Sequence, residues 1–242
     1  MNLYETRRLL DEYLLFHYGT PAEVLPWAQG PSDALSFPVR SVTELADFSL
    51  APHTALDLGC AVGRSSFELA KHCPQVIGID YSQSFIQAAQ TLQATGSLDY
   101  ERLDEGTQCT RLTARVPADC PRAQVSFETG DAMHLRADLG SFHLVHAANL
   151  LCRLTQPHLL LQRLPDLVLP GGQLLLTTPC TWLEEFTPLG NWPQGSTLDW
   201  LEQTLSAHFT LAEQKDLPFL IREHARKYQW SVALGTRWLR RA

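Results

Sequence analysis

Short, nearly continuous apolar runs alternate with longer mixed segments over residues 55–178 of this chain. The first four runs begin at Ala55, Val76, Val125 and Phe142, and a fifth run follows a helix end and a turn within 169–178. Such runs are typical of parallel strands that are buried on both faces, and the segment 84–94 between two of them predicts a helix. Two further strands are expected near 209–211 and 229–233. Strands that alternate with helices predict an α/β fold, with a mostly parallel sheet and helices on both faces.

Two amphipathic segments before the first strand predict an N-terminal helical cap over residues 1–50. Residues 3–18 carry apolar side chains at helical spacing, and a second helix is predicted over residues 40–48. Residues 19–38 between them contain several prolines and glycines together with large apolar side chains. This composition predicts an ordered loop that crosses the domain.

A long connection over residues 96–124 separates the second predicted helix from the third strand. Structureless loops longer than about 12–15 residues are uncommon in compact domains. Residues 100–103 and 111–116 can pair across a turn that contains Gly106, which predicts an inserted β-hairpin. No linker divides the chain, so residues 1–242 are expected to form a single domain.

Composition and charge narrow the class of protein. The chain has 242 residues and a formal net charge of -7, which disfavours a broad phosphate-binding face and therefore nucleic acid as a partner. Its six cysteines form no C-x-x-C pair and its nine histidines form no pair at metal-ligand spacing, so reduced thiols and no metal site are expected. No apolar run approaches the ~18 residues of a membrane span. These observations predict a cytoplasmic protein without membrane contact.

The first strand runs into a tight turn that contains Gly59 and Gly63, and a helix is predicted from Arg64. Glycine allows the backbone to turn sharply and to approach a ligand, and the start of a helix offers unpaired N–H groups. Asp80 ends the second strand and can accept hydrogen bonds from ribose hydroxyls. Asp57 precedes the glycines, whereas the nicotinamide fingerprint begins with glycine and binds a pyrophosphate. An acid at this position favours a cationic ligand that carries a nucleoside.

The segment 55–66 resembles motif I of the class I S-adenosylmethionine (SAM) methyltransferases, and 76–82 resembles their second motif. Ala61 stands where motif I usually has its middle glycine. The resemblance implies a Rossmann-like class I fold with a seven-stranded sheet that binds SAM and releases S-adenosylhomocysteine. In that family the acid after the third strand, here Asp131, meets the adenine amino group. The implied cofactor-binding residues are Asp57, Gly59, Cys60, Ala61, Gly63, Arg64, Asp80, Tyr81, Ser82, Asp131, Ala132 and Asn149.

Segments outside the cofactor core resemble the 4-mercaptohistidine N1-methyltransferases of ovothiol biosynthesis, and the likeness covers nearly the whole chain. These segments are residues 1–6, 12–19, 37–40, 57–68, 148–154, 181–188 and 218–230. The resemblance implies methyl transfer from SAM to an imidazole nitrogen of 5-thiohistidine (4-mercaptohistidine), which gives ovothiol A. In many relatives this unit is fused behind a sulfoxide synthase. A separate sulfoxide synthase is therefore a candidate partner.

A methyl acceptor with a sulfur and two ring nitrogens has to be held in one orientation. The candidates to anchor it are Tyr13, His17, Arg40, Arg153, Trp182, Glu184, Arg222 and Arg226. An arginine can clamp the substrate carboxylate in bidentate fashion, and Arg40, Arg222 and Arg226 compete for this role. Alternatively, Arg222 and Arg226 form a solvated helix face, Trp182 belongs to the core and Glu184 caps a helix.

Three residues are candidates for contact with the reacting atoms. Asn149 follows the fourth strand, at the sheet edge where ligands bind in α/β proteins, and Tyr18 ends the first helix. His224, with a usual pKa of ~6.5, can accept the ring proton that is released on methylation. It can equally be a histidine packed beside Tyr228 and Trp230.

Two other functions remain open from the sequence. The first is a SAM-dependent methyltransferase for another small molecule, such as a carboxylate, a thiol or a phenol. The second is a SAM-binding regulatory or partner subunit without catalysis, which Ala61 in motif I makes conceivable. The acids and glycines of the motifs argue against the second function, because Asp57, Gly59, Gly63, Asp80 and Asp131 are all present.

Overall fold

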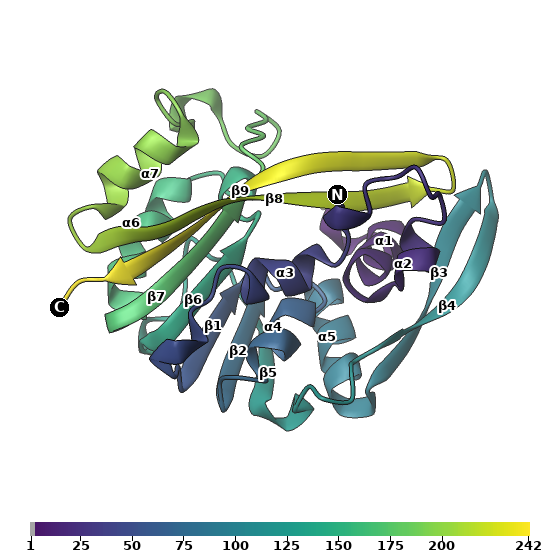
Figure 1. Cartoon of the computed structure of the whole chain (residues 1–242), viewed down its shortest axis with the longest axis horizontal. Coiled ribbons are helices and arrows are strands. Elements are labelled where there is room, and N and C mark those ends of the chain that lie inside the picture. Colours follow the sequence, from purple (N-terminus) through teal and green to yellow (C-terminus); the bar gives the residue numbers. More distant parts are fainter. Residues whose placement is uncertain (1–2) are drawn as a thin grey trace.

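A seven-stranded sheet forms the centre of the computed structural model, which describes residues 3–242 (Figure 1). The strands are β1 (Thr54–Leu58), β2 (Gln75–Asp80), β5 (Val125–Thr129), β6 (Phe142–Ala148), β7 (Val168–Thr178), β8 (Phe209–His224) and β9 (Lys227–Arg240). Their order is β5-β2-β1-β6-β7-β9-β8, and β9 runs antiparallel to both of its neighbours. The predicted α/β fold with a mostly parallel sheet is confirmed. Met1 and Asn2 of the predicted cap lie outside the described residues.

Helices cover both faces of the sheet (Figure 1). On one face lie α3 (Phe37–Thr43), α4 (Arg64–Leu69) and α5 (Gln83–Thr95), and on the other lie α6 (Pro157–Leu167) and α7 (Thr197–Leu205). Side chains of β1 pack on both faces of the sheet. Ala55 packs against the helices of the first face, and Leu56 and Leu58 pack against those of the second. Because both faces are covered, the parallel strands are mostly apolar, as the sequence pattern indicates.

The N-terminal cap contains η1 (Leu3–Glu5), α1 (Arg7–Tyr18), α2 (Pro21–Val24), η2 (Ser32–Ala34), α3 and η3 (Phe48–Leu50). The helix predicted over residues 40–48 is α3, so it begins and ends earlier than expected. Pro38 suits the first turn of a helix, where its missing N–H has no partner to lose. The backbone N–H of Asp47 instead donates to the side chain of Gln173 on β7, which fixes the chain outside the helix. The short α2 within the predicted loop starts with a capping box between Thr20 and Glu23.

The predicted inserted hairpin is present as β3 (Ser97–Glu105) and β4 (Gln108–Arg115), which pair antiparallel in a sheet of their own. The hairpin contacts α1 and α5 and lies at the end of the molecule that carries the β8–β9 turn (Figure 1). Arg222 of β8 donates to Asp104 of β3 at 2.8 Å, and the N–H of Ala225 donates to the carbonyl of Asp104 at 3.0 Å. The insertion is thus tied to the last hairpin of the chain.

The last two strands are far longer than the short runs near 209–211 and 229–233 indicate. They stay paired from Phe209 and Arg240 to His224 and Lys227, and their outer part runs past the sheet over the cap (Figure 1). Leu217 and Phe219 of this outer part belong to the same apolar cluster as the side chains of α1 and α3. Polar residues interrupt the apolar pattern, so the sequence conceals the full length of both strands.

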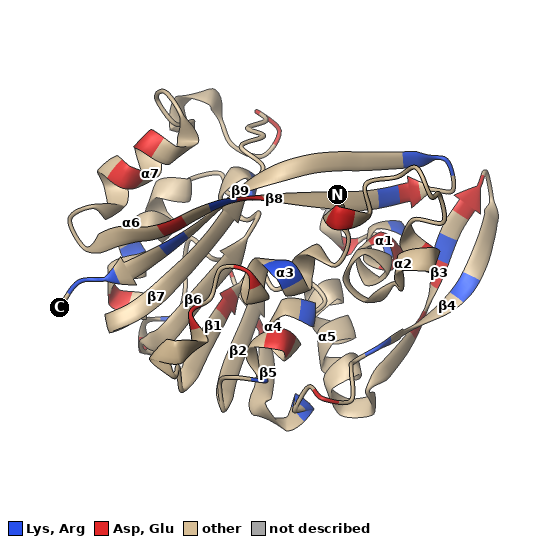
Figure 2. Ribbon diagram, in the orientation of Figure 1, with Lys and Arg blue, Asp and Glu red and all other residues tan. Residues whose placement is uncertain are grey.

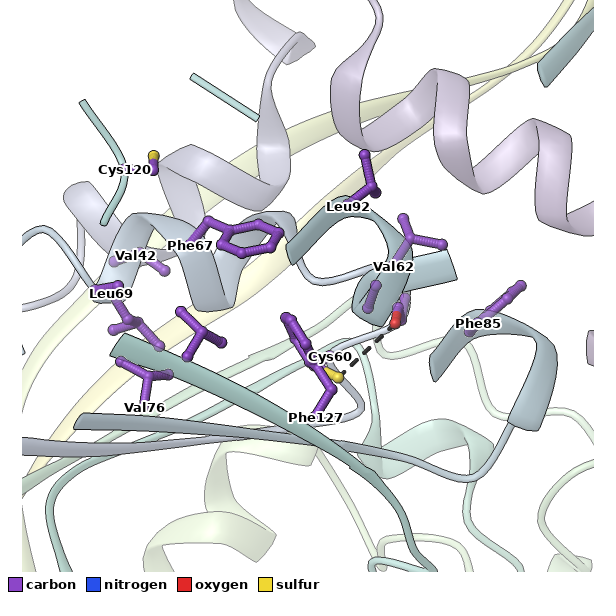
Figure 3. Close-up of a cluster of buried hydrophobic side chains, with 14 of the residues drawn as sticks. Val42, Cys60, Val62, Phe67, Leu69, Val76, Phe85, Leu92, Cys120 and Phe127 are labelled. Carbon is purple, nitrogen blue, oxygen red and sulfur yellow. Dashed lines mark hydrogen bonds between the residues drawn. The ribbon is translucent and has the colours of Figure 1, made fainter. Parts of the chain in front are cut away.

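Apolar packing holds the turn after β1 in place from below (Figure 3). Gly63, the residue before α4, has a φ of +83°, which glycine adopts without strain. A Cβ at this position would lie 2.6 Å from Cζ of Phe127. The ring of Phe127 in turn packs edge-on against Phe67, with ring centroids 5.5 Å apart. The turn and the core beneath it therefore fit each other only with a glycine at position 63.

We expect Gly63→Ala to lower the free energy of unfolding by about 2–4 kcal/mol, because a strained φ and an overpacked contact with Phe127 act together. Gly106→Ala is the matched control. Its φ is also positive, at +59°, but a Cβ there would meet nothing within 4 Å, so about 1–2 kcal/mol is expected from the backbone alone. Urea unfolding of both variants measures the difference. Equal losses would show that the contact with Phe127 is unimportant.

Candidate active site

A cavity of about 490 Å³ opens at the carboxyl ends of β1, β2, β5, β6 and β7, a place where α/β sheets bind ligands. The residues that line the cavity form two groups, which we describe as its two ends. The first group comes from the loops after β1, β2 and β5, and the second consists of aromatic side chains from the cap, α5 and β8 together with Arg153 after β6. Its volume lies in the usual range for small-molecule and cofactor sites.

Asp80 is the central acid of the first end, which we call the cofactor end. Its Oδ2 accepts a hydrogen bond from the backbone N–H of Ala61 and its Oδ1 accepts one from that of Ser82, both at 2.9 Å. A carboxylate has about four acceptor sites, so two remain for ligand hydroxyls. Burial raises the pKa of Asp80 to about 6, although the two backbone N–H groups oppose this shift.

The turn beside Asp80 has three residues with positive φ: Gly59 at +69°, Ala61 at +48° and Gly63. Alanine in this region is strained by roughly 1 kcal/mol, and the hydrogen bond from its N–H to Asp80 holds it there. Ala61 therefore replaces the usual glycine without opening the turn. A Cβ on Gly59 would lie 3.1 Å from the side chain of Leu150, so the turn also needs a glycine at this position.

Asp131 closes the cofactor end after β5. Its Oδ1 accepts from the N–H of Met133 at 2.9 Å, and its Oδ2 lies 3.0 Å from Nδ1 of His134. The predicted cofactor residues that line the cavity are Gly59, Ala61, Asp80, Tyr81, Ser82, Asp131, Ala132 and Asn149. Paired acids beside a close backbone turn fit the hydroxyl groups and the adenine of SAM.

Four predicted cofactor residues do not line the cavity: Asp57, Cys60, Gly63 and Arg64. The expectation that Asp57 faces a cationic ligand is corrected, because its oxygens are occupied by the hydroxyls of Ser65 and Ser66 and by the ring of His146. Cys60 packs in the core (Figure 3), Gly63 lies against Phe127, and Arg64 forms a buried ion pair with Glu68. These residues hold the turn rather than contact a ligand.

Aromatic rings line the second end, which we call the acceptor end. Tyr13 of α1 lies 4.7 Å from the ring centroid of Phe85 and stacks on His17 at 5.9 Å. Phe37 of α3 lies 5.0 Å from Phe219 of β8. Flat apolar faces of this kind suit a flat ring as ligand.

Two polar atoms at this cavity are buried without a hydrogen-bond partner among the described residues: Nδ1 of His17 and Nη1 of Arg153. Burial lowers the pKa of His17 to about 3, so its ring is neutral. The guanidinium of Arg153 lies 4.4 Å above the ring of Phe186. Buried polar groups are normally satisfied, so both atoms indicate a polar ligand.

Asn149 follows β6 and lines the cavity, with a φ of +53°. Its Oδ1 accepts from Thr177 at 3.0 Å, and its backbone N–H donates to the Thr177 carbonyl at 2.8 Å. The side-chain amide therefore has a fixed orientation at the carboxyl edge of the sheet. Of the predicted substrate residues, Tyr13, His17 and Arg153 also line the cavity.

The remaining predicted arginines lie outside the cavity, because each is engaged elsewhere. Arg40 pairs with Glu44 and donates to the Pro218 carbonyl. Arg222 donates to Asp104 and to the carbonyl of Glu23, and Arg226 lies over the ring of Trp27. The prediction that they anchor the substrate is corrected: they fasten the cap and the two hairpins to each other.

Four further candidates are also placed outside the cavity. Trp182 donates to Thr197 and packs on the second layer, and Glu184 lies in the exposed segment after β7. His224 lies at the β8–β9 turn, where its Nδ1 accepts from a backbone N–H. Tyr18 donates its hydroxyl to the carbonyl of Val62 at 2.8 Å. The expected catalytic roles of His224 and Tyr18 are therefore corrected, since neither side chain faces the cavity.

Several residues of the acceptor end were not among the sequence candidates. They are Tyr4, Phe16, Phe37, Ser41, Phe85 and Phe219. A signal for some of them was present, because Phe16, Phe37 and Phe219 lie in segments that resemble the ovothiol enzymes. Ser41 and Phe85 lie outside these segments, so only the structure places them at the cavity.

Charged side chains of both signs are interspersed over the molecule (Figure 2). Within residues 3–242, none of the helices combines the length and the apolar character that crossing a bilayer requires. The same residues contain no group of three His, Cys, Asp or Glu side chains that could hold a metal ion.

Comparison with known proteins gives a consistent result. The profile of a family described as "Methyltransferase domain" matches residues 32–223. The [4+2]-cyclase SpnF has a similar structure, with a TM-score of 0.59 and 16% identity over 99% of this chain and 95% of that chain. The N-methyltransferase NodS from Bradyrhizobium japonicum, in complex with S-adenosylhomocysteine, has a TM-score of 0.55 and 16% identity over 96% of this chain and 98% of that chain. At these identities the two structures share a fold with this chain.

Proposed function

Because this chain belongs to the methyltransferase domain family and uses SAM as its methyl donor, we propose that it methylates an imidazole ring nitrogen of 5-thiohistidine. The acceptor end of the cavity carries the proposal. It offers aromatic faces for a flat ring, a guanidinium with an unpaired N–H for a carboxylate, and a neutral imidazole with an unpaired nitrogen. The resemblance of the surrounding segments to the ovothiol enzymes selects 5-thiohistidine among ligands of this shape.

The cofactor end would hold SAM through residues whose polar atoms are already oriented. Asp80 would accept the ribose hydroxyls, Asp131 would face the adenine, and the turn with Gly59 and Ala61 would bring backbone close to the ligand. When bound, SAM supplies a methyl group on a positively charged sulfur. Asn149 lines the cavity at the carboxyl edge of the sheet.

Orientation is the main task of the residues at the acceptor end. Holding two reactants in attack geometry can supply roughly 7–11 kcal/mol of a barrier. Arg153 can clamp the substrate carboxylate, and the rings of Tyr13 and Phe219 limit the tilt of the imidazole. These contacts keep the more nucleophilic sulfur away from the methyl group, so the ring nitrogen reacts.

Product analysis tests the proposal. The protein is incubated with SAM that carries a ¹³C-labelled methyl group and with 5-thiohistidine, and the product is examined by mass spectrometry and NMR. We expect a single new methyl group, on a ring nitrogen. A methyl group on sulfur, or no product while SAM is bound, would contradict the substrate assignment and leave the fold and cofactor intact.

The proposed substrate requires an enzyme that joins sulfur to histidine. We therefore also propose a separate sulfoxide synthase as the partner reaction, with both proteins in the cytoplasm. All six cysteines are free thiols, which fits a reducing compartment.

We expect Asp80→Ala to weaken SAM binding by tenfold or more. Hydrogen bonds to a charged group contribute about 1.5–3 kcal/mol, and about 1.4 kcal/mol corresponds to a factor of ten. Asp138→Ala is the matched control, because this acid is exposed and pairs with Arg136 away from the cavity. Calorimetry of both variants gives the comparison. Equal affinity in Asp80→Ala and the control would remove the ribose role from Asp80.

SAM binding should also depend on pH. The ionised form of Asp80 accepts the hydroxyls, so binding is full above its pKa of about 6 and is lost as the pH falls through that value. Between pH 7 and pH 5 the affinity should fall by about tenfold, since about one tenth of the carboxyl groups are ionised at pH 5. Calorimetry across this range measures the slope. Asp80→Asn should remove it, and an unchanged slope in that variant would assign the titration to another group.

A further inference from the structure

A buried line of three polar residues leads from the acceptor end of the cavity into the sheet. Ser41 of α3 lines the cavity, and its Oγ lies 3.1 Å from Nε2 of His146 on β6. The other ring nitrogen of His146, Nδ1, lies 2.7 Å from Oδ1 of Asp57 on β1. His146 has no solvent-exposed surface and takes no part in holding either ligand. The order of contacts is serine, histidine, acid, starting from the cavity.

The state of Asp57 determines where the proton of a neutral His146 lies. The hydroxyls of Ser65 and Ser66 donate to Oδ2 of Asp57 at 2.7 and 2.6 Å, which favours the ionised carboxylate. An ionised carboxylate only accepts hydrogen bonds. Nδ1 of His146 must therefore carry a hydrogen, and in the neutral ring Nε2 keeps a free lone pair.

Ser41 has a partner for its hydroxyl proton in both states of His146. When the ring is neutral, the hydroxyl donates to Nε2. When the ring is protonated, Nε2–H donates to Oγ and the hydroxyl can donate to the carbonyl of Pro38, at 3.3 Å. No buried polar group loses its partner when the proton moves, so the change of state avoids the penalty of an unsatisfied group.

We propose that Ser41, His146 and Asp57 form a proton relay that removes the acceptor's proton during methyl transfer. The proposal rests on the function proposed above, because methylation of a neutral ring nitrogen releases one proton. The ring nitrogen's lone pair forms the new bond to the methyl carbon, and the electrons of the broken S–C bond stay on sulfur. The proton on the other ring nitrogen of the substrate passes to Oγ of Ser41 as the hydroxyl proton of Ser41 passes to Nε2 of His146. After product release the same path returns the proton to solvent through the cavity.

The other histidines considered for this task are less suited to it. His224 lies at the β8–β9 turn, outside the cavity. His17 lies at the cavity, but burial lowers its pKa to about 3, so it binds a proton poorly. His146 differs from both because a carboxylate stands directly behind it.

Kinetics with 5-thiohistidine test the relay. Ser41→Ala should lower kcat by about 10²-fold, the lower end of what proton transfer by a positioned group contributes, while KM and the Kd for SAM stay unchanged. His146→Gln should have a similar effect, and the double variant should lose no more than either single variant, because groups that act as a unit are not additive. Additive losses would overturn the relay.

Thr236→Val is the matched structural control. It also removes a fully buried hydroxyl, which donates to the carbonyl of Leu176 on β7, and Thr236 of β9 lies outside the cavity and does not contact the relay. Thermal unfolding should show a loss of stability in both Ser41→Ala and Thr236→Val, with the large fall in kcat confined to Ser41→Ala. An equal fall in both would make the role of Ser41 structural and refute the proposal.

Imidazole ¹⁵N NMR gives a readout that does not depend on turnover. With the His146 signals assigned by their loss in His146→Gln, a neutral ring should carry its hydrogen on Nδ1, and Ser41→Ala should shift the Nε2 resonance. A hydrogen on Nε2 in the neutral ring would overturn the relay, since that nitrogen could not take a proton. The wild-type protein separates the two proposals: no N-methylated product means that the proposed function fails and the relay with it, whereas product formed at equal rates by wild type and Ser41→Ala refutes the relay alone.

Discussion

Histidine is expected to be methylated about 10⁴-fold less efficiently than 5-thiohistidine, as measured by kcat/KM. A site built to hydrogen-bond a substrate group rejects an analogue without that group, because its own buried polar atoms then stay unpaired. Nδ1 of His17 is a buried atom of this kind at the acceptor end. Competition between the two substrates for labelled SAM, read by mass spectrometry, measures the ratio. Comparable use of both would exclude recognition of the sulfur.

The control for this selectivity is His17→Phe, which keeps a flat ring at the position but has no nitrogen. We expect this variant to lose discrimination between 5-thiohistidine and histidine more than it loses activity towards histidine. If His17→Phe lowers kcat/KM for 5-thiohistidine and for histidine by the same factor, His17 only fills space, and another group contacts the sulfur.

Removing the guanidinium of Arg153 should have the next largest effect. Arg153→Ala is expected to lower kcat/KM for 5-thiohistidine by about 10- to 100-fold, mainly through KM, because charge-assisted hydrogen bonds contribute about 1.5–3 kcal/mol. Steady-state kinetics measure the loss. Arg226→Ala is the matched control, since Arg226 lies over Trp27 outside the cavity.

A substrate without a carboxylate sharpens this test. The decarboxylated analogue of 5-thiohistidine keeps the ring, the sulfur and the amino group. It should react poorly with the wild type and lose little further in Arg153→Ala, because the two changes remove the same contact. An equal loss for both substrates would mean that Arg153 supports the cavity wall and does not bind the carboxylate.

Local patterns were sufficient to predict the cofactor half of this protein. The strand over residues 55–58, the glycine turn after it and the acid at position 80 are close in sequence, so their order reflects their arrangement in space. The exceptions are Asp57, Cys60, Gly63 and Arg64, which do not line the cavity, and Asp57 shows why. Its partner His146 is 89 residues away, and nothing near Asp57 in the sequence indicates that its oxygens are occupied.

The acceptor half was predicted less well, because its residues are brought together by distant contacts. Tyr13, His17 and Arg153 were expected there, and all three line the cavity. Arg222 was expected there as well, but it binds the carbonyl of Glu23, 199 residues away, and Asp104, 118 residues away. A single sequence does not display such pairings, so an arginine that fastens two hairpins resembles one that binds a substrate.

The same limit applies to strand length. A polar run over residues 213–216 separates the apolar residues of β8, and only its pairing with β9, which contains two shifts of register, extends the strand to His224. The turn expected before the last core strand lies inside β7, where the register with β6 shifts after Phe142. Backbone pairing between strands sets the end of β8 and the start of β7, and a local sequence pattern does not reveal that pairing.

The elements that supply the acceptor end also determine when it can form during folding. The β8–β9 hairpin is local, because its strands are joined by a short turn after His224, and such hairpins form within microseconds. The acceptor end needs α1 and α3, near the start of the chain, to contact β8, near the end of the chain. Contacts across so many residues form slowly, because closing the long loop between them costs conformational entropy. The turn after β1 can therefore form before the acceptor end does. The methyl-accepting half of the cavity exists only in the completely folded chain.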